Sequence, residues 1–237
     1  MKRFALICVA VFSIFGWTLA ADNNPNQLTP AEKAAGWRLL FDGNSLQGWR
    51  GYKLAGPPET GWEIQDHLLK TVPKAKGREL ITVDKFNDFE FSWEWKVAPA
   101  GNNGVKYFVT EDRPGAPGHE YQMIDDESNP DGKVGLHHAT AAFYDVIPAP
   151  AERPLKKAGE WNQSRIVVNG IKVEHWLNGK MVLAYELGSD QVKAGLAKSK
   201  FAKYPDFGTK IQGPIMLTYH NDECWYRNIK IREIKTK

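Results

Sequence analysis

The sequence predicts an all-β protein, an antiparallel β-sandwich or jelly roll. The dipeptides Asn169-Gly170 and Asn178-Gly179 each separate two runs of alternating residues, which is the strongest short-range signal of a β-hairpin. Residues 89–96 alternate strictly and place four aromatic side chains on one face, as expected for a strand that packs on a core. Many short strands separated by turns are typical of sandwiches and jelly rolls.

The expected strands follow one another at short intervals along the chain. Three of them, within residues 165–185, form a meander that the two Asn-Gly turns close. Residues 192–204 are the one candidate for a helical or irregular insertion, with lysines on a solvated face. The other expected strands cover residues 37–41, 62–69, 80–83, 89–96, 105–109, 119–124, 214–220 and 225–234.

The first 20 residues have the pattern of a secretory signal peptide. Lys2 and Arg3 precede the apolar run 4–17, and small residues follow before Ala21, which is the order of charged, apolar and cleavage regions in such a leader. The run is short for a membrane span, so no integral membrane segment is expected after cleavage. The mature protein is therefore expected in the periplasm or the medium of a bacterium.

The rest of the chain is expected to form one domain after a short lead-in. Residues 21–35 are polar and contain prolines, so they are expected to be a linker, with one helical turn near Thr29. Residues 36–237 are long enough for a single all-β domain. Cys224 is the one cysteine left after leader removal, which excludes an internal disulfide.

The charge balance argues against nucleic-acid binding. The chain has 31 Lys and Arg against 28 Asp and Glu, a formal net charge of +3. Loss of Lys2 and Arg3 with the leader leaves 29 basic against 28 acidic side chains, a net charge of +1. Proteins that bind nucleic acid through their overall charge carry a much larger basic surplus.

The strongest candidate site is the strand at residues 119–124 and the turn after it. Glu120 and Gln122 are two positions apart, so they stand on one face about 6.6 Å from each other. Asp125 and Asp126 follow directly. Carboxylates and an amide on one surface suit binding or acid–base chemistry on a polyhydroxylated ligand. The alternative interpretation is a solvated outer face.

Common catalytic and metal motifs are missing from the sequence. It has neither a glycine-rich phosphate loop before a helix nor a Gly-x-Ser-x-Gly elbow, which argues against a nucleotide enzyme and a serine hydrolase of that type. Adjacent His137 and His138 would point to opposite faces of a strand, a poor spacing for zinc. No cofactor is expected, although Asp125, Asp126 and Asp131 could form a calcium site instead of a solvated acidic turn.

The spacing Glu120-x-Gln122-x-x-Asp125 resembles the Glu-x-Asp-x-x-Glu strand of laminarinase-like retaining glucanases, which are also jelly rolls. Asp125 would share the face of Glu120 only if a bulge inserted one residue, and without a bulge Asp126 would do so. A retaining mechanism needs two carboxyl groups about 5 Å apart. Gln122 cannot ionise, so the motif does not promise that geometry.

An ordered series of short motifs lies between Trp37 and Ile234. It consists of residues 40–43, 46, 49, 89–91, 94, 102–105, 120–126, 160–162, 177–179 and 226–231. This series resembles the 3-keto-disaccharide hydrolase domain family, a group of exported bacterial jelly rolls of the concanavalin A-like type. The resemblance implies cleavage of a glycoside that a partner oxidoreductase has first oxidised to a ketone at C3. It also implies removal of the C2 proton, loss of the C1 substituent and addition of water.

This implied reaction needs a base near C2, donors for the enolate oxygen and an acid for the leaving group. By type and position, Glu120 or a histidine is the expected base, Lys106 the enolate stabiliser, and His220 or Asp125 the acid. The expected substrate-binding residues are Gln122, Lys106, Asn103, Glu94, Tyr144, His175 and Asp126.

Alternatives stay open for single residues and for the whole protein. His175 lies on an apolar face of the meander and could be a core histidine. Trp49, Trp62 and Tyr144 could stack on sugar in a non-catalytic carbohydrate-binding module. An ordinary glucanase acting on unoxidised sugar is the third interpretation, and Gln122 argues against it.

Overall fold

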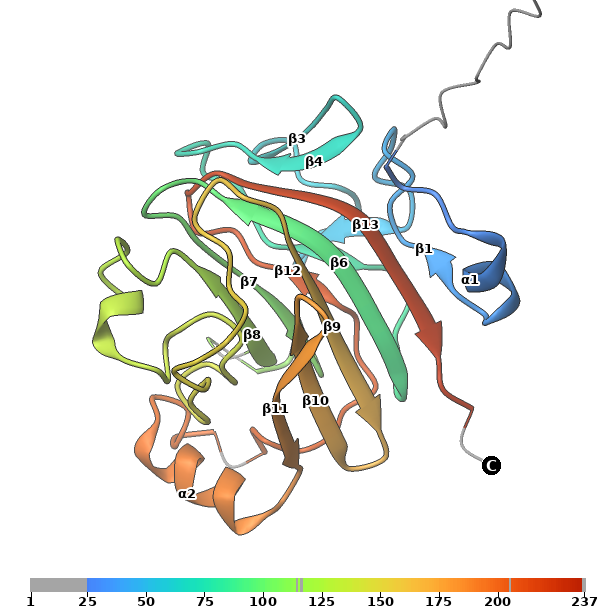
Figure 1. Cartoon of the computed structure of the whole chain (residues 1–237). Coiled ribbons are helices and arrows are strands. Elements are labelled where there is room, and N and C mark those ends of the chain that lie inside the picture. Colours follow the sequence, from blue (N-terminus) through green and yellow to red (C-terminus); the bar gives the residue numbers. More distant parts are fainter. Residues whose placement is uncertain (1–24, 114, 116, 205, 236–237) are drawn as a thin grey trace, which may run out of the picture.

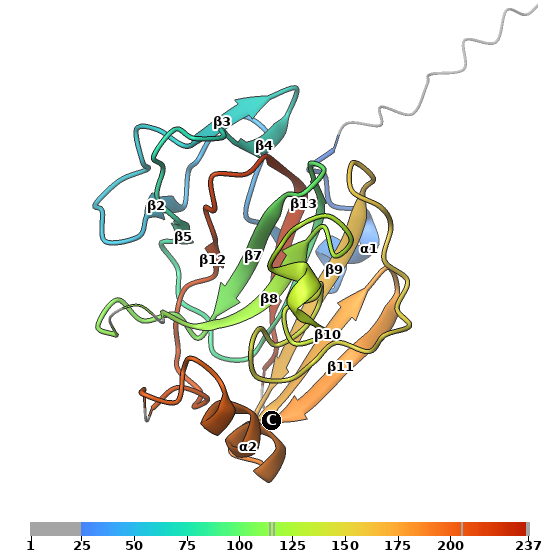
Figure 2. The same ribbon diagram turned by 90° about the vertical axis from the view of Figure 1, so that its left-hand side faces the viewer.

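The computed structural model describes residues 25–113, 115, 117–204 and 206–235, so the expected signal peptide at 1–20 lies outside the described residues. Within them, two antiparallel sheets pack face to face (Figures 1 and 2). The predicted antiparallel β-sandwich of the concanavalin A-like jelly-roll type is confirmed.

The larger sheet of the described chain has eight strands, in the order β11-β10-β9-β6-β13-β4-β3 with β1 paired to β13. The smaller sheet has five strands, in the order β2-β5-β12-β7-β8. The larger sheet consists of β1 (Arg38–Leu39), β3 (Trp62–Gln65), β4 (Leu68–Thr71), β6 (Phe89–Val97), β9 (Asn162–Asn169), β10 (Lys172–Leu177), β11 (Lys180–Glu186) and β13 (Cys224–Glu233). The smaller consists of β2 (Trp49–Gly51), β5 (Leu80–Thr82), β7 (Asn102–Tyr107), β8 (His119–Ile124) and β12 (Met216–Leu217).

The core lies between the sheets, and the aromatic face of β6 forms its centre. Trp93 reaches across to β8, where its ring lies edge-on to Tyr121 at 5.1 Å between centroids and its Nε1 donates to Met123 Sδ at 3.3 Å. The four aromatic side chains of β6 are almost fully buried, as the alternation predicted: Phe89, Phe91, Trp93 and Trp95.

Some expected strands are divided or shorter. Residues 62–69 form the hairpin β3–β4 rather than one strand, because Asp66 and His67 adopt positive φ angles of 51° and 60° and reverse the chain. The expected strands at 37–41 and 214–220 are reduced to β1 and β12.

The helical segments are short. The expected insertion at 192–204 overlaps α2 (Asp190–Lys198), which begins two residues earlier and whose first turn is capped by the Ser189 side chain. A short 3₁₀ turn, η1 (Gly132–Val134), lies in the segment after β8. The expected turn near Thr29 is α1 (Pro30–Ala34), with a complete capping box between Thr29 and Glu32. Such a cap satisfies backbone donors that a short helix leaves unpaired.

The described part of the expected linker contacts the domain. Asn26 is 5% exposed, and its backbone N–H donates to Asn228 Oδ1 at 2.7 Å while the Asn228 N–H donates to Asn26 Oδ1 at 2.8 Å. The Asn26 Nδ2 donates to the His67 carbonyl at 2.8 Å. These bonds hold residues 25–35 against β13, on the side of the molecule where Figure 1 shows α1 and β1.

A directed chain of hydrogen bonds runs through the core. The His175 Nδ1–H donates to the Ala141 carbonyl at 2.9 Å, so its Nε2 accepts from the Tyr107 hydroxyl at 2.8 Å. Tyr107 then accepts from Tyr185 at 2.6 Å, and Tyr185 accepts from His119 Nδ1 at 3.2 Å. This sequence of donors fixes both histidines as neutral tautomers and leaves His119 Nε2 without a partner among the described residues.

Burial lowers the pKa of both core histidines, to about 3 for His119 and about 4 for His175. An unfolded histidine takes up a proton below pH 6.5, whereas these two stay neutral in the fold. The free energy of unfolding therefore falls as the pH drops through 6.5 toward the folded-state values, with a slope that approaches about 1.4 kcal/mol per pH unit for each histidine.

We expect urea unfolding between pH 7 and pH 5 to show this slope, and His119→Phe to halve it. Phenylalanine keeps the stacking of His119 on Phe143, whose centroids lie 4.4 Å apart, but cannot take up a proton. A slope that is the same in His119→Phe and in the parent protein would contradict the assignment.

Candidate active site

The candidate site is built on the outer face of the β7–β8 pair. Lys106 and Glu120 are directly opposite each other in the register, and directly opposed side chains of an antiparallel pair lie on the same face. Their neighbours Tyr107 and Tyr121 point the other way, where they bond His175 and the Ser164 hydroxyl of the larger sheet. Lys106, Glu120 and the next outward residue on β8, Gln122, therefore face away from the core.

A cavity of about 90 Å³ opens on this face. Its walls come from β7, β8, the loop that joins them, the segment after β8, the segment after α2 and the segment after β12. The lining residues are Asn102, Lys106, Gly115, Pro117, Gly118, Glu120, Gln122, Asp131, Tyr144, Lys200, Phe201 and His220.

Glu120 is the buried charge at the centre of the cavity, with 6% of its surface exposed. Its Oε2 lies 3.4 Å from Lys106 Nζ, and its Oε1 lies 3.9 Å from His220 Nε2. Burial by itself would raise the pKa of the carboxyl, but Lys106, His220 and Lys200 stabilise the ionised form and lower that pKa to about 2. The site therefore holds a carboxylate in its charged form at neutral pH.

Gly104 makes room for that carboxylate. A Cβ at this position would lie 2.3 Å from Glu120 Oε1 and 3.1 Å from its Cδ. Glycine on β7 therefore lets the Glu120 side chain lie across the neighbouring strand, where Lys106 is its partner. Any larger residue would force the carboxylate to move.

Asp131 holds two side chains, Tyr144 and His138, on the opposite wall. Its carboxylate accepts from the Tyr144 hydroxyl at 3.0 Å and lies 2.7 Å from His138 Nδ1. The other ring nitrogen of His138 lies 3.2 Å from Asp145. Burial and the charge of Asp131 raise the pKa of Tyr144 well above its usual value, so its phenol stays protonated.

Gln122 and Asn102 line the cavity, and each has a buried amide oxygen without a protein partner among the described residues. The Gln122 Nε2 makes a long bond of 3.5 Å to Asp131 Oδ2, while its Oε1 is buried without a protein partner among the described residues. The Asn102 Oδ1 is likewise buried without a protein partner among these residues. Buried polar atoms are normally paired, so these two atoms are suited to accept hydrogen bonds from a hydroxylated ligand.

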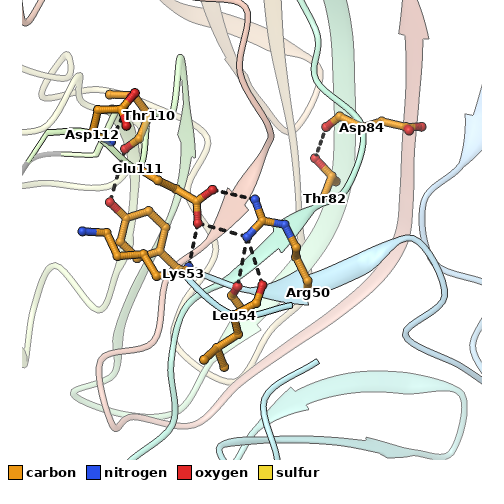
Figure 3. Close-up of polar contacts among 10 residues, drawn as sticks. Arg50, Lys53, Leu54, Thr82, Asp84, Thr110, Glu111 and Asp112 are labelled. Atoms are coloured by element: carbon orange, nitrogen blue, oxygen red, sulfur yellow. Dashed lines mark hydrogen bonds and ion pairs between the residues drawn. The ribbon is translucent and has the colours of Figure 1, made fainter. Parts of the chain in front are cut away.

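Two ion pairs hold the β7–β8 loop in place. Figure 3 shows Arg50 of β2 paired with Glu111 through two bonds, of 3.0 and 2.6 Å, and the Lys53 N–H donating to the same carboxylate. Further along the loop, Arg113 bonds Asp206, with Nη2 to Oδ2 at 2.6 Å. This second pair ties the loop to the segment after α2, and both segments line the cavity.

Lys200 completes that wall. Its Nζ lies 4.3 Å from the centroid of the Tyr144 ring, and its backbone N–H donates to Asp145 Oδ2 at 2.8 Å. The segment after α2 is thereby held against the segment after β8.

The structure brings five of the residues expected from the sequence into this one cavity: Glu120, His220, Gln122, Lys106 and Tyr144. Asp125 and Asp126 lie instead beside a separate cavity of about 380 Å³. Asp125 accepts from the backbone N–H groups of Ala100, Glu127 and Ser128. It follows a β8 register without a bulge, so it orders a turn and does not join Glu120.

Three further expected residues are also placed elsewhere. Asn103 is fully buried and accepts from Thr218 Oγ1 at 2.7 Å. Glu94 lies on the outer face of the other sheet, where Asn228 Nδ2 donates to it at 2.8 Å. His175 is the core histidine described above, which was the alternative interpretation of that residue.

The three aspartates of the suggested calcium site have separate partners. Asp125 caps its own turn, Asp126 pairs with Arg153, and Asp131 bonds Tyr144. Among the residues that the structure describes, no group of three or more His, Cys, Asp or Glu side chains is arranged to hold a metal ion. No helix in that part of the chain is long and apolar enough to cross a membrane.

The sequence reasoning missed Asp131, Asn102, Lys200 and Phe201 as parts of this cavity. Asp131 appeared in it only as a calcium candidate, and Lys200 only as part of a solvated basic face. Lys200 is 80 positions from Glu120 in the sequence, and no local pattern reports such an approach. Asn102 stands two positions before Gly104 and four before Lys106, so the alternation of a strand places it on the same face as Lys106 and could have indicated its place in the cavity.

Comparisons with known proteins agree in the family they indicate. The family described as the 3-keto-alpha-glucoside-1,2-lyase-like domain matches residues 36–232. A 3-keto-disaccharide hydrolase from Bacteroides thetaiotaomicron is 34% identical, over 84% of this chain and 79% of that protein. A crystal structure from Parabacteroides distasonis, provisionally assigned to the glycosyl hydrolases, is 31% identical with a TM-score of 0.79 and covers 89% of this chain and 100% of its own.

A more distant structure shares the fold alone. The carbohydrate-binding module CBM66 from Bacillus subtilis is 9% identical with a TM-score of 0.50, over 78% of this chain and 96% of its own.

We expect Lys106→Met to raise the pKa of Glu120 from about 2, because the cost of burial remains while the nearest cation is lost. Carboxyl ¹³C titration, with Glu120→Gln to assign the signal, measures this. Lys200→Met is the matched control and should raise the pKa less, since Lys200 is the weaker of the two influences. An unchanged pKa in Lys106→Met would contradict the assigned ion pair.

Proposed function

The chain belongs to the 3-keto-α-glucoside-1,2-lyase-like domain family, and from this membership we propose that it is an enzyme that cleaves 3-keto glycosides. The observation that supports the proposal best is the buried, ionised Glu120 with Lys106 and His220 on either side, at the floor of an open cavity. Buried charge is costly unless it is paired, and a carboxyl group in a cleft whose pKa is shifted by burial and a specific charge partner is a candidate for a functional site.

The proposed reaction is an elimination followed by hydration. The ketone at C3 acidifies the C2 proton, and a base removes it. The electron pair left at C2 forms a C1=C2 double bond as the C1–O bond breaks, and the leaving oxygen takes up a proton. Water then adds its oxygen to C1 and a proton returns to C2, so the sum is hydrolysis to a 3-keto sugar.

We propose that the pair formed by His220 and Glu120 removes the C2 proton. A carboxylate with a pKa near 2 is a weak base, because efficient proton transfer needs a pKa near the working pH. Glu120 therefore serves mainly to orient the imidazole of His220 and to hold Lys106. Imidazole is the side chain most often used for such proton transfer, and the ring of His220 is 42% exposed and so open to a substrate.

Charge on the enolate oxygen would be stabilised by Lys106, whose Nζ lies at the cavity floor. A cation fixed beside the developing negative charge is the usual device for this purpose. Gln122 and Asn102 would accept from sugar hydroxyls through their unpartnered oxygens. The protonated Tyr144 phenol, on the opposite wall, is the candidate donor to the leaving oxygen.

The glucanase interpretation finds little support in this geometry. Retaining hydrolysis needs a second carboxyl group about 5 Å from the first. Asp125 accepts from two backbone N–H groups of its own turn and from the Ala100 N–H between β6 and β7. In addition, β8 has no bulge that would bring Asp125 onto the face of Glu120.

The proposal also includes export of the protein and formation of its 3-keto substrate by another enzyme. The leader pattern at residues 1–20 supports export to the periplasm or the medium, and N-terminal sequencing of the protein from cells should begin at Ala21. The 3-keto substrate would come from a sugar oxidoreductase acting upstream. An intact Met1 would overturn the export proposal without touching the chemistry.

We expect the protein to cleave a 3-keto disaccharide and to leave the unoxidised parent disaccharide intact, because only the ketone acidifies the C2 proton. Glu120→Gln should lower turnover at least about a hundredfold, the usual scale for losing a group that supports proton transfer. Product formation on both sugars, followed by chromatography, measures this. Equal rates on the two sugars would instead favour a glycosidase.

A further inference from the structure

A second groove crosses the outer face of the eight-stranded sheet, on the opposite side of the sandwich from the candidate active site. Four of its residues occupy one line of the register: Trp176 of β10 faces Arg165 of β9, Arg165 faces Ser92 of β6, and Ser92 faces Lys230 of β13. Figure 1 shows these strands side by side, with α1 and β1 beyond β13.

The groove is hollow because its central residue is small. Ser92 lies between the long side chains of Arg165 and Lys230, and directly opposed residues stand close together on one face. The resulting cavity is about 250 Å³, larger than that of the candidate active site. It is lined by Glu32, Trp37, Ser92, Gln163, Ser164, Arg165, Trp176, Gly179 and Lys230.

Tryptophan stands at each end of the groove. Trp37 comes just before β1, which pairs with β13, and Trp176 is on β10. Arg165 lies 4.2 Å from the centroid of the Trp176 ring, and Arg232 lies 5.3 Å from that of Trp37. Cations of this kind hold the indole rings in place, while both residues still line the cavity.

The charges beside the groove are already paired. Lys230 bonds Glu32, and Arg165 lies 3.2 Å from Glu90. A ligand that relied on negative charge would have to compete with these carboxylates. The same paired groups both donate and accept hydrogen bonds, which is what the vicinal hydroxyls of a neutral sugar require.

We propose that this groove, between Trp37 and Trp176, is a second carbohydrate-binding site for a neutral oligosaccharide. The indoles offer apolar surfaces to the C–H faces of sugar rings, and Glu32, Gln163 and Lys230 offer polar groups to the hydroxyls. Five adjacent strands from β10 to β1 span about 19 Å at the usual strand spacing, so the groove suits a short chain of sugars rather than one ring.

The site stands apart from the proposed chemistry. Glu120 and Lys106 belong to the outer face of the other sheet, and the aromatic core separates the two faces. A chain bound in the groove would hold the protein on a carbohydrate while the opposite face stays open. The proposed ligand is an unoxidised sugar, so this proposal does not depend on the proposed cleavage of 3-keto glycosides.

The test uses ¹⁵N-labelled full-length protein carrying Glu120→Gln, with cellotriose and maltotriose as neutral probes up to about 10 mM, enough to detect a Kd in the millimolar range. The indole N–H signals of Trp37 and Trp176, assigned with Phe variants, should shift and saturate with at least one probe. The signal of Trp225, an indole of β13 that does not line the groove, should stay in place. Trigalacturonate, a charged probe, should bind at least about tenfold more weakly.

Ser92→Phe provides the matched variant, because the larger side chain fills the groove from the outer face and phenylalanine suits a strand. It should abolish the shifts and leave turnover of a 3-keto disaccharide by otherwise native protein unchanged. Trp37→Ala and Trp176→Ala should each weaken binding at least about tenfold, and Trp225→Ala should not. Absence of shifts with both neutral probes, tighter binding of trigalacturonate, or undiminished binding in both Trp37→Ala and Trp176→Ala would overturn the proposal.

Discussion

The pairing of β7 with β8 is the constraint on which both core and site depend. Its two-residue period sends Tyr107 and Tyr121 into the core, where they bond His175 and Ser164, and sends Lys106 and Glu120 to the cavity. A slip of one residue would bury the carboxylate among aromatic rings and expose the tyrosines. The hydrogen bonds of the inner face therefore fix the geometry of the outer one.

Neighbouring residues offset the free-energy cost of burying the Glu120 carboxylate. Lys106 from the facing strand and His220 from the segment after β12 surround the carboxylate, and Gly104 leaves the space that it occupies. Buried ion pairs rarely stabilise a fold more than apolar residues of the same volume would. The arrangement is therefore easier to understand as preparation for a charged step in catalysis than as a contribution to stability.

The sequence predicted what local period and turn chemistry determine, and little of what distant segments bring together. The aromatic face of β6 and the outward position of Glu120 follow from alternation within one strand. Lys200 reaches the cavity through an insertion far along the chain. Asp125 does not reach it, because two backbone N–H groups of its own turn and the distant Ala100 N–H hold its carboxylate. Glu94 had the right residue type and period but belongs to the other sheet.

The central claim is that cleavage begins with removal of the proton at C2, and heavy water tests it most directly. The protein is given a 3-keto disaccharide in D₂O, and the released 3-keto sugar is examined by NMR or mass spectrometry before the free sugar exchanges by itself. Elimination and hydration predict deuterium at C2 of the product, because that proton is returned from solvent. Rapid cleavage with ordinary hydrogen retained at C2 would contradict the account and point to direct displacement at C1.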